Sequence, residues 1–339
     1  MKLGSIGHPS LAPMRHGFIV DDARHYLSAR PFINEMHNNT QAWSGSGSGS
    51  VDANGWITAM PNGQSVSKII LHGQIYPVDY LRSGRYVCTW SGPLSLDVTS
   101  GSSAITNKVA TDHRIEFDLA ALSAGNSGGN FINVVVTNNS GAVGSVSDIA
   151  VFHSDNEADY LAGEIFEPNF LDALHGADVL RFLGWMGTNS STTVNYVDFK
   201  TEASCIWFPI PISVIGKLGA KLNKSLWICL PHQATQDCMN AVAAELWNQI
   251  GATPNVKVYG EYSNETWNSI FTQNGYVTAT KSIGLTIVDN NGIASTDAID
   301  KAACATAHGA MQVWSALETY FPRSRGYRVY AGQAANWGT

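Results

Sequence analysis

The spacing of hydrophobic and polar positions changes twice along the chain. Near the N-terminus a short apolar run, Gly17 to Val20, is followed at once by Asp21 and Asp22, which predicts the first strand of a barrel. Pro31 to His37 then has the pattern of one or two helical turns. Residues 44–50 alternate Ser and Gly, the composition of a flexible loop or linker. Residues 1–16 hold no apolar run and are predicted to be an N-terminal extension.

Between residues 66 and 153 apolar and polar positions alternate over short segments. Leu94, Leu96 and Val98 are separated by Ser95 and Asp97, and residues 115–119 repeat the pattern. Such segments predict strands with one face buried and the other in water. Further strands are predicted at 68–71, 84–90, 131–136 and 147–152. About seven short strands in ~90 residues predict a β-sandwich.

After residue 153 short apolar runs alternate with segments of helical periodicity. Strands are predicted at 179–183, 225–230, 256–262 and 327–332. Helices are predicted near 170–174, at 212–222, after a capping Thr235, and in a longer segment that ends at Pro322. Strands that alternate with helices indicate parallel βαβ units.

Together these patterns predict an α/β fold: a partial (β/α)8 TIM-type barrel of about five strands, with a β-sandwich inserted after the first barrel strand. Residues 17–65 would hold the first barrel strand, a helix and the Gly/Ser-rich loop, and residues 66–153 the sandwich. Residues 154–339 would supply barrel strands two to five. A closed barrel has eight strands, so the chain is expected to end in mid-barrel.

Composition narrows the class of protein. Charged residues are 14% of the chain, against about 25% in average proteins, and the net charge is −7. No Lys/Arg run suggests a nucleic-acid partner, and no 18-residue apolar run predicts a membrane span. The five cysteines are widely spaced and odd in number, which indicates neither a zinc site nor a disulfide framework. No other metal or organic cofactor is implied by the sequence. A surface of low charge favours an extracellular or virion-associated protein.

The strongest chemical signal is the polar end of the predicted strand 256–262. Asn264 and Glu265 close this run and lie among aromatic residues. In a parallel α/β barrel such strand ends converge on one face, where catalytic groups lie. A carboxylic acid beside apolar rings can donate a proton to a leaving oxygen near neutral pH, and an amide can hold a substrate hydroxyl. The alternative is a Glu that caps the next helix or faces solvent.

Three segments carry a resemblance to a known group of proteins. They are Leu180 to Asn189, Leu230 to Asp237 and Tyr259 to Asn268. They resemble clan-A-type glycoside-hydrolase-like (β/α)8 barrel proteins with an inserted N-terminal β-sandwich, often secreted or carbohydrate-binding. The resemblance covers roughly residues 17–336, and its most specific element is the Asn-Glu pair at the end of the fourth barrel strand.

The resemblance implies a role for each matching residue. Glu265 would be the general acid/base and Asn264 the partner of a sugar hydroxyl, with Arg181, His232 and Asn189 lining the site. Trp185 and Trp267 would stack on sugar rings. Each has an alternative: Arg181 as a core ion pair, His232 as a buried loop histidine, and both tryptophans as core rings.

The second catalytic carboxylate is not found in the sequence. Glycoside hydrolysis uses two carboxyl groups, about 5–5.5 Å apart in retaining enzymes and about 6.5–9.5 Å apart in inverting ones. Glu261 lies four residues before Glu265, and an extended strand would separate them by about 13 Å. The resemblance places the nucleophile on a seventh strand, beyond Thr339. A Gly-x-Ser-x-Gly match at 125–129 lacks the following helix of a nucleophile elbow and is interpreted as a loop.

Two functions are therefore expected. The first is a glycoside hydrolase-like protein acting on the O-glycosidic bonds of a polysaccharide, with Glu265 as proton donor. The second is a non-catalytic glycan-binding or structural protein, such as a phage tail, virion or surface component with other chains as partners, built on a degenerate glycosidase barrel.

Overall fold

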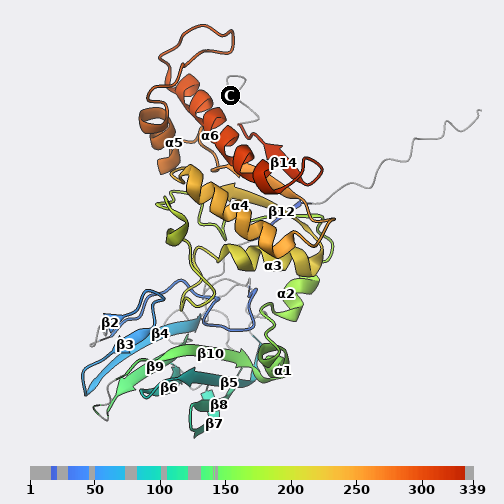
Figure 1. Cartoon of the computed structure of the whole chain (residues 1–339). Helices are drawn as coiled ribbons and strands as arrows, with labels where there is room; N and C mark the ends of the chain where they lie inside the picture. Colours follow the sequence, from blue (N-terminus) through green and yellow to red (C-terminus); the bar gives the residue numbers. More distant parts are fainter. Residues whose placement is uncertain are drawn as a thin grey trace, which may run out of the picture.

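The computed structural model describes residues 17–20, 30–45, 50–72, 82–100, 105–120, 131–139, 141 and 144–332. It has an α/β architecture, as the sequence predicted: a five-strand parallel sheet interleaved with helices, and separate antiparallel sheets between its first and second strands. Figure 1 shows the parallel sheet with its helices in one half of the molecule and the antiparallel sheets in the other. The N-terminal extension, Asp21-Asp22, most of the Gly/Ser stretch and the Gly-x-Ser-x-Gly segment lie outside the described residues.

The parallel sheet has the order β1-β11-β12-β13-β14, so each strand pairs with the next strand of the sheet along the chain. The strands are β1 (Gly17–Ile19), β11 (Val179–Arg181), β12 (Ser225–Leu230), β13 (Val258–Tyr262) and β14 (Gly326–Val329). The predicted strands 225–230 and 256–262 are confirmed, the second beginning two residues later. All four pairings are parallel, and all five strands therefore end at one edge of the sheet.

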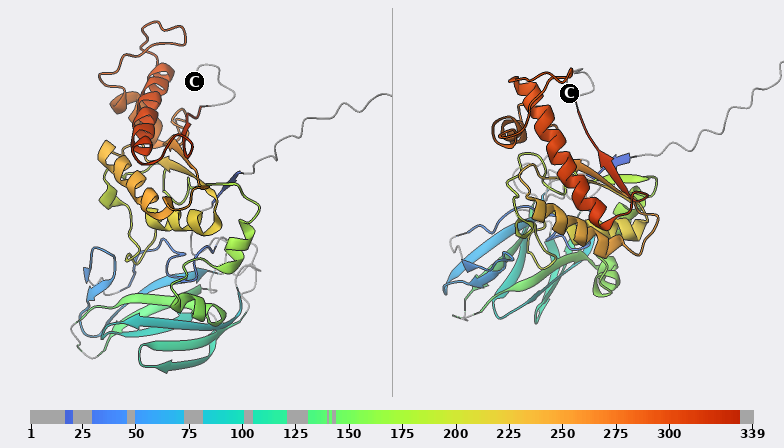
Figure 2. Two further views of the ribbon diagram at one scale, coloured as in Figure 1. Left: turned by 45° about the vertical axis from the view of Figure 1, so that its right-hand side comes forward. Right: turned by 45° about the horizontal axis from the view of Figure 1, so that its top comes forward.

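Helices pack on one face of this sheet. Around it lie α2 (Pro168–Ala173), η3 (Tyr196–Asp198), α3 (Ile212–Leu222), α4 (Gln236–Ile250), α5 (Thr272–Tyr276), the π-helical segment η4 (Val277–Lys281) and α6 (Ala298–Tyr320). The side chain of Thr235 accepts a hydrogen bond from the backbone N–H of Cys238 and caps α4, as predicted. The turned views show α6 as a long helix beside β14 (Figure 2). No helix of the described residues is both long enough and apolar enough to cross a bilayer.

Glycines allow the helices to approach the strands closely. A Cβ on Gly260 of β13 would lie 2.3 Å from a methyl carbon of Leu317 on α6, and a Cβ on Gly309 of α6 would lie 2.5 Å from the ring of Tyr262. These contacts assign Gly260 and Tyr262 to the face of the sheet that the helices cover. Because side chains alternate along a strand, Tyr259 and Glu261 project from the opposite face.

The antiparallel strands all lie between β1 and β11. One sheet has the order β10-β5-β8-β7, a second β4-β9-β6, and a short third pairs β2 with β3. Buried side chains of the first two sheets, among them Val98, Phe117, Val134 and Val151, form one apolar core. The strands are β2 (Ser50–Val51), β3 (Ile57–Ala59), β4 (Gln64–His72), β5 (Gly84–Ser91), β6 (Ser95–Ser100), β7 (Ile105–Thr111), β8 (Arg114–Leu119), β9 (Phe131–Asn138) and β10 (Ser147–His153), followed by η2 (Ser154–Asn156) and α1 (Glu157–Leu161).

Two segments of the structure differ from what the sequence pattern predicts. Strand β7 is almost wholly exposed, so it lacks the apolar alternation that marks its neighbours. The helical turns predicted at 31–37 are a bridge residue, Phe32, followed by bends and a turn. Here Asn38 bonds both the N–H and the C=O of Phe32, and Asn34 accepts from Met36, so asparagine side chains replace the helical ladder.

Substitution of Gly309 tests this packing. In Gly309→Ala the new methyl group meets the buried Tyr262 ring, so we expect the free energy of unfolding to fall by about 1–3 kcal/mol, as for other overpacked cores. Gly275→Ala on α5 is the control, because no atom lies within 4 Å of its Cβ position; we expect no loss of stability there. Urea unfolding of both variants would measure the difference, and equal stability would contradict the close approach.

Candidate active site

Asn264 and Glu265 lie directly after the carboxyl end of β13, where the sequence placed them. Ser263 continues the strand by donating its N–H to the carbonyl of Leu230, and the chain then turns sharply. Ser263 and Glu265 both have left-handed backbone conformations, with φ of 59° and 41°. Asn264 is buried, whereas Glu265 is partly exposed and accepts a hydrogen bond of 2.8 Å from the side chain of Asn268. The turn therefore buries the amide and leaves the carboxylate accessible.

Arg181 joins this turn to the neighbouring strands. Its guanidinium donates from Nη2 to Oδ1 of Asn264 at 2.9 Å and to Oε2 of Glu261 at 2.8 Å. Strand register brings Arg181 and Glu261 together. Arg181 of β11 pairs with Trp227 of β12, and Cys229, two residues further along β12, pairs with Glu261 of β13. The structure thus brings Arg181 and Asn264 together and also gives Arg181 the buried ion pair that was the alternative interpretation.

Glu261 is the buried centre of the cluster. It is only 2% exposed, and its Oε2 also accepts from Nε1 of Trp227 at 2.8 Å and from Sγ of Cys229 at 3.1 Å. Burial, with the Glu261 carboxylate as a second cause, raises the pKa of the Cys229 thiol well above its usual value, so the thiol stays protonated and donates. Burial opposes the charge on Arg181, but the Glu261 carboxylate, which accepts a hydrogen bond from the guanidinium, outweighs burial, and the pKa of Arg181 is raised.

Asn189, in the loop after β11, is a further member of this hydrogen-bonded cluster. Its Oδ1 accepts from Nδ2 of Asn264 at 3.0 Å and from Nε2 of Gln273 at 2.9 Å. Gln273, in the first turn of α5, is fully buried and also donates to the carbonyl of Asn264 at 2.8 Å. Three of the predicted site residues, Arg181, Asn189 and Asn264, therefore belong to one hydrogen-bonded network that starts beside Glu265.

His232 and Trp185 are both buried. His232 is 1% exposed, and no hydrogen bond of the described residues joins it to the Arg181 network or reaches its Nδ1. Its ring packs edge-on against Tyr276, and its carbonyl accepts from the hydroxyl of Tyr262. Trp185 is fully buried and packs on Phe170 and Phe182. Both residues occupy the core positions that their alternative interpretations require.

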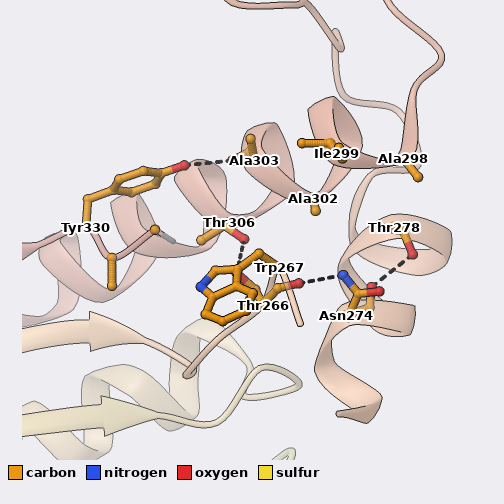
Figure 3. Close-up of a pocket in the computed structure, with 12 residues that line it drawn as sticks. Thr266, Trp267, Asn274, Thr278, Ala298, Ile299, Ala302, Ala303, Thr306 and Tyr330 are labelled. Carbon is orange, nitrogen blue, oxygen red and sulfur yellow. Dashed lines mark hydrogen bonds between the residues drawn. The ribbon is translucent and has the colours of Figure 1, made fainter. Parts of the chain in front are cut away.

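Trp267 is partly exposed and lines a cavity of about 230 Å³ (Figure 3). The walls come from the turn after β13, from α5 and η4, from α6 and from the residues that follow β14. Several polar groups there are paired with the protein: Thr306 with Thr266, Asn274 with the carbonyl of Thr266, and Tyr330 with the carbonyl of Ala303. Glu265 is not among the lining residues, so the cavity adjoins the turn without containing its carboxylate.

The positioning groups of the site carry little signal in the sequence. Glu261 is the exception, because a Glu inside an apolar strand indicates that a cation lies nearby to compensate its buried charge. Gln273, Trp227 and Cys229 carried no signal in the sequence, because their contacts depend on strand register and on the return of α5. Among the described residues no group of three or more His, Cys, Asp or Glu side chains is placed to hold a metal ion.

Comparison of the chain with protein-family models, with curated proteins and with solved structures gives no match. The case for a function therefore depends on the geometry of this site.

The burial of His232 predicts an acid-sensitive fold. Burial lowers the pKa of His232 to about 4, whereas an unfolded histidine titrates near 6.5. Below pH ~6.5 the unfolded chain therefore binds a proton that the folded imidazole accepts only near pH 4. We expect the free energy of unfolding to fall across this window, by up to about 1.4 kcal/mol per pH unit from this group.

Urea unfolding at pH 7.5, 5.5 and 4.5 would measure this slope. His232→Gln should make it shallower, whereas His308→Gln, on an exposed position of α6, should leave it unchanged. His37 acts in the same direction, since burial and the charge of Lys68 lower its pKa, so part of the slope should persist in His232→Gln. An identical slope in wild type and His232→Gln would contradict the assignment.

Proposed function

We propose that this chain is a glycoside hydrolase-like protein that acts on O-glycosidic bonds of a polysaccharide, with Glu265 as general acid/base. The observation that carries the proposal is the hydrogen bond of 2.9 Å between Arg181 at the end of β11 and Asn264 at the end of β13, directly before Glu265. Parallel α/β folds bind substrates at the carboxyl ends of their strands, and here polar groups of two strands converge at that edge.

The fold and the resemblance support the same proposal. The strand order β1-β11-β12-β13-β14 is the sequential order of a (β/α)8 barrel, and we propose that the sheet is a part of one. The antiparallel sheets that share a core would be the β-sandwich inserted after its first strand. The three segments that resemble the clan-A-type proteins span the carboxyl ends of β11, β12 and β13 and the loops that follow, where such proteins carry their chemistry.

The hydrogen bonds within the site determine which donors and acceptors each side chain can offer to a sugar. Arg181 has donors only, so Oδ1 of Asn264 faces it and the amide nitrogen faces Asn189. Among the described residues no further hydrogen bond uses the second N–H of Asn264 or the remaining lone pair of Oδ1, and these are the atoms that a sugar hydroxyl would have to reach in this buried amide. Asn268 bonds to Oε2 of Glu265, so among the described residues Oε1 has no partner and can donate its proton to a leaving oxygen. The partly exposed ring of Trp267 would stack on a sugar.

Glycan binding without hydrolysis is the second candidate. Either stereochemical course of hydrolysis uses two carboxyl groups, and Glu261, the other carboxylate of the β13 end, is occupied by three donors. A chain with this site would serve as the glycan-binding part of a phage tail, virion or surface assembly, with other chains as partners and an extracellular or virion-associated location. The low content of charged residues, 14%, supports this setting.

The variant Glu265→Gln tests the proposal. It removes the transferable proton but preserves an oxygen for Asn268, so the turn should survive. On an aryl glycoside that the wild-type protein hydrolyses, we expect a loss of about 10²–10⁴-fold in kcat, the contribution of a general acid. Glu245→Gln on α4 is the matched control, because its carboxylate also accepts one side-chain amide N–H, from Gln249 at 2.8 Å.

The outcomes separate the two candidates. Wild-type activity in Glu265→Gln would reject the acid/base role. Absence of hydrolysis in the wild-type protein, together with binding to an immobilised polysaccharide that Asn264→Ala weakens, would favour the binding function. Absence of both would reject glycans as ligands.

A further inference from the structure

Gln273 is the buried side chain on which the two loops of the candidate site converge. It is 0% exposed and makes three hydrogen bonds: its Oε1 accepts from the N–H of Ser190 at 2.9 Å, and its Nε2 donates to Oδ1 of Asn189 and to the carbonyl of Asn264. These partners belong to the loops after β11 and β13, while Gln273 itself is on α5. One side chain thus connects three segments that are far apart in the sequence.

The partners fix the orientation of the glutamine amide. A backbone N–H can only donate and a backbone carbonyl can only accept, so the oxygen must face Ser190 and the nitrogen must face Asn264. Nε2 uses both of its hydrogens. Among the standard neutral side chains only Asn and Gln combine one acceptor with two donors, and Asn is one methylene shorter. The position therefore requires glutamine chemically as well as sterically.

The backbone around these contacts is held in an unfavourable conformation. Ser190, whose N–H meets Gln273, has φ of 52°, and Ser263 and Glu265, on either side of Asn264, have φ of 59° and 41°. A left-handed residue with a Cβ costs roughly 1–2 kcal/mol and persists only where its surroundings restrain it. The hydrogen bonds of Gln273 to Ser190 and Asn264 are such restraints. They act directly on the turn that aims the Glu265 carboxylate.

The same contacts determine what Asn189 can offer to a ligand. Its Oδ1 is occupied by two donors, from Gln273 and Asn264, so its exposed side chain presents its amide N–H groups. A group that binds there must be a hydrogen-bond acceptor, such as the oxygen of a sugar hydroxyl. We propose that Gln273 is a positioning residue of the site, which holds Asn189 in a donor orientation and the Asn264-Glu265 turn in its strained conformation. This inference rests on the proposed glycan function for the identity of the ligand but not for the positioning itself.

The variant Gln273→Met tests the positioning in the full chain. It retains the volume and flexibility of the side chain and removes all three hydrogen bonds. By NMR we expect the side-chain amide signals of Asn189 and Asn264 to move toward unstructured values and the Ser190 amide to exchange faster with solvent. On a 4-nitrophenyl glycoside that the wild type hydrolyses, kcat should fall about tenfold or more, with a smaller rise in KM. Gln236→Met is the matched control, since Gln236 donates to Asn240 on α4 and to the carbonyl of Gln312 on α6, which are not partners of Gln273, Asn189 or Asn264.

Gln273→Glu adds a second test, whose expected pH dependence would not result from a general loss of stability. When protonated, the carboxyl group accepts from Ser190 and donates to one of the two oxygens; when ionised, it only accepts. Burial raises the pKa of such a carboxyl group, so the Asn264 signals should approach those of wild type at pH 5 and be lost at pH 8. This is a partial, pH-dependent rescue that Gln273→Met does not show.

Three results would overturn the proposal: unchanged Asn189 and Asn264 signals in Gln273→Met, an equal effect of Gln236→Met on those signals and on kcat, or Gln273→Glu signals that do not change between pH 5 and pH 8. If Gln273→Met does not fold, the Gln273→Glu comparison decides. If the wild-type protein neither binds nor hydrolyses a glycan, the proposed function fails, whereas the NMR comparison still decides the role of Gln273.

Discussion

The buried carboxylate of Glu261 is the constraint on which the site depends. A charge that is 2% exposed must be compensated by a cation and by hydrogen-bond donors, or the strand that carries it would not pack. Arg181 supplies the cation from β11, and Trp227 and Cys229 supply donors from β12. Removing one partner of such a pair costs about 3–5 kcal/mol, because the other charge stays buried. Strands β11, β12 and β13 are thereby coupled through Oε2 of Glu261. The Arg181 guanidinium that pairs with Glu261 also orients Asn264.

Much of the fold was predictable because its strongest elements obey local rules. The apolar face of α4, its Thr235 cap and the apolar run of β12 are visible in the sequence, and so is the alternation in β8 and β9. The exceptions have identifiable causes. Strand β7 is solvated on both faces and has no periodicity, and the segment after Phe32 is organised by asparagine side chains rather than by helical hydrogen bonds.

The candidate site was predictable only in part. A polar pair that closes an apolar strand marks Asn264 and Glu265, because the position follows from the strand alone. The partners of Asn264 follow from register and loop geometry, which sequence periodicity does not contain. The two tryptophans of the predicted site also differ: Trp185, which follows the apolar residues 182–183, is fully buried in the core, and Trp267, which lies between Thr266 and Asn268, lines a cavity.

Strand register links the site to the sheet as a whole. Arg181, Trp227, Tyr259 and Tyr327 are successive register partners across four parallel strands. Their side chains lie in one row, with the Arg181 guanidinium 5.1 Å from the Trp227 ring and the rings of Tyr259 and Tyr327 stacked at 4.9 Å. A slip of one residue in the β11–β12 or β12–β13 pairing would turn a strand over and move its member of the row onto the helix-covered face. It would also separate Arg181 from Glu261 and from Asn264. The register that satisfies the buried charge is therefore the same register that assembles the candidate site, so selection for a stable sheet also preserves the geometry around Glu265.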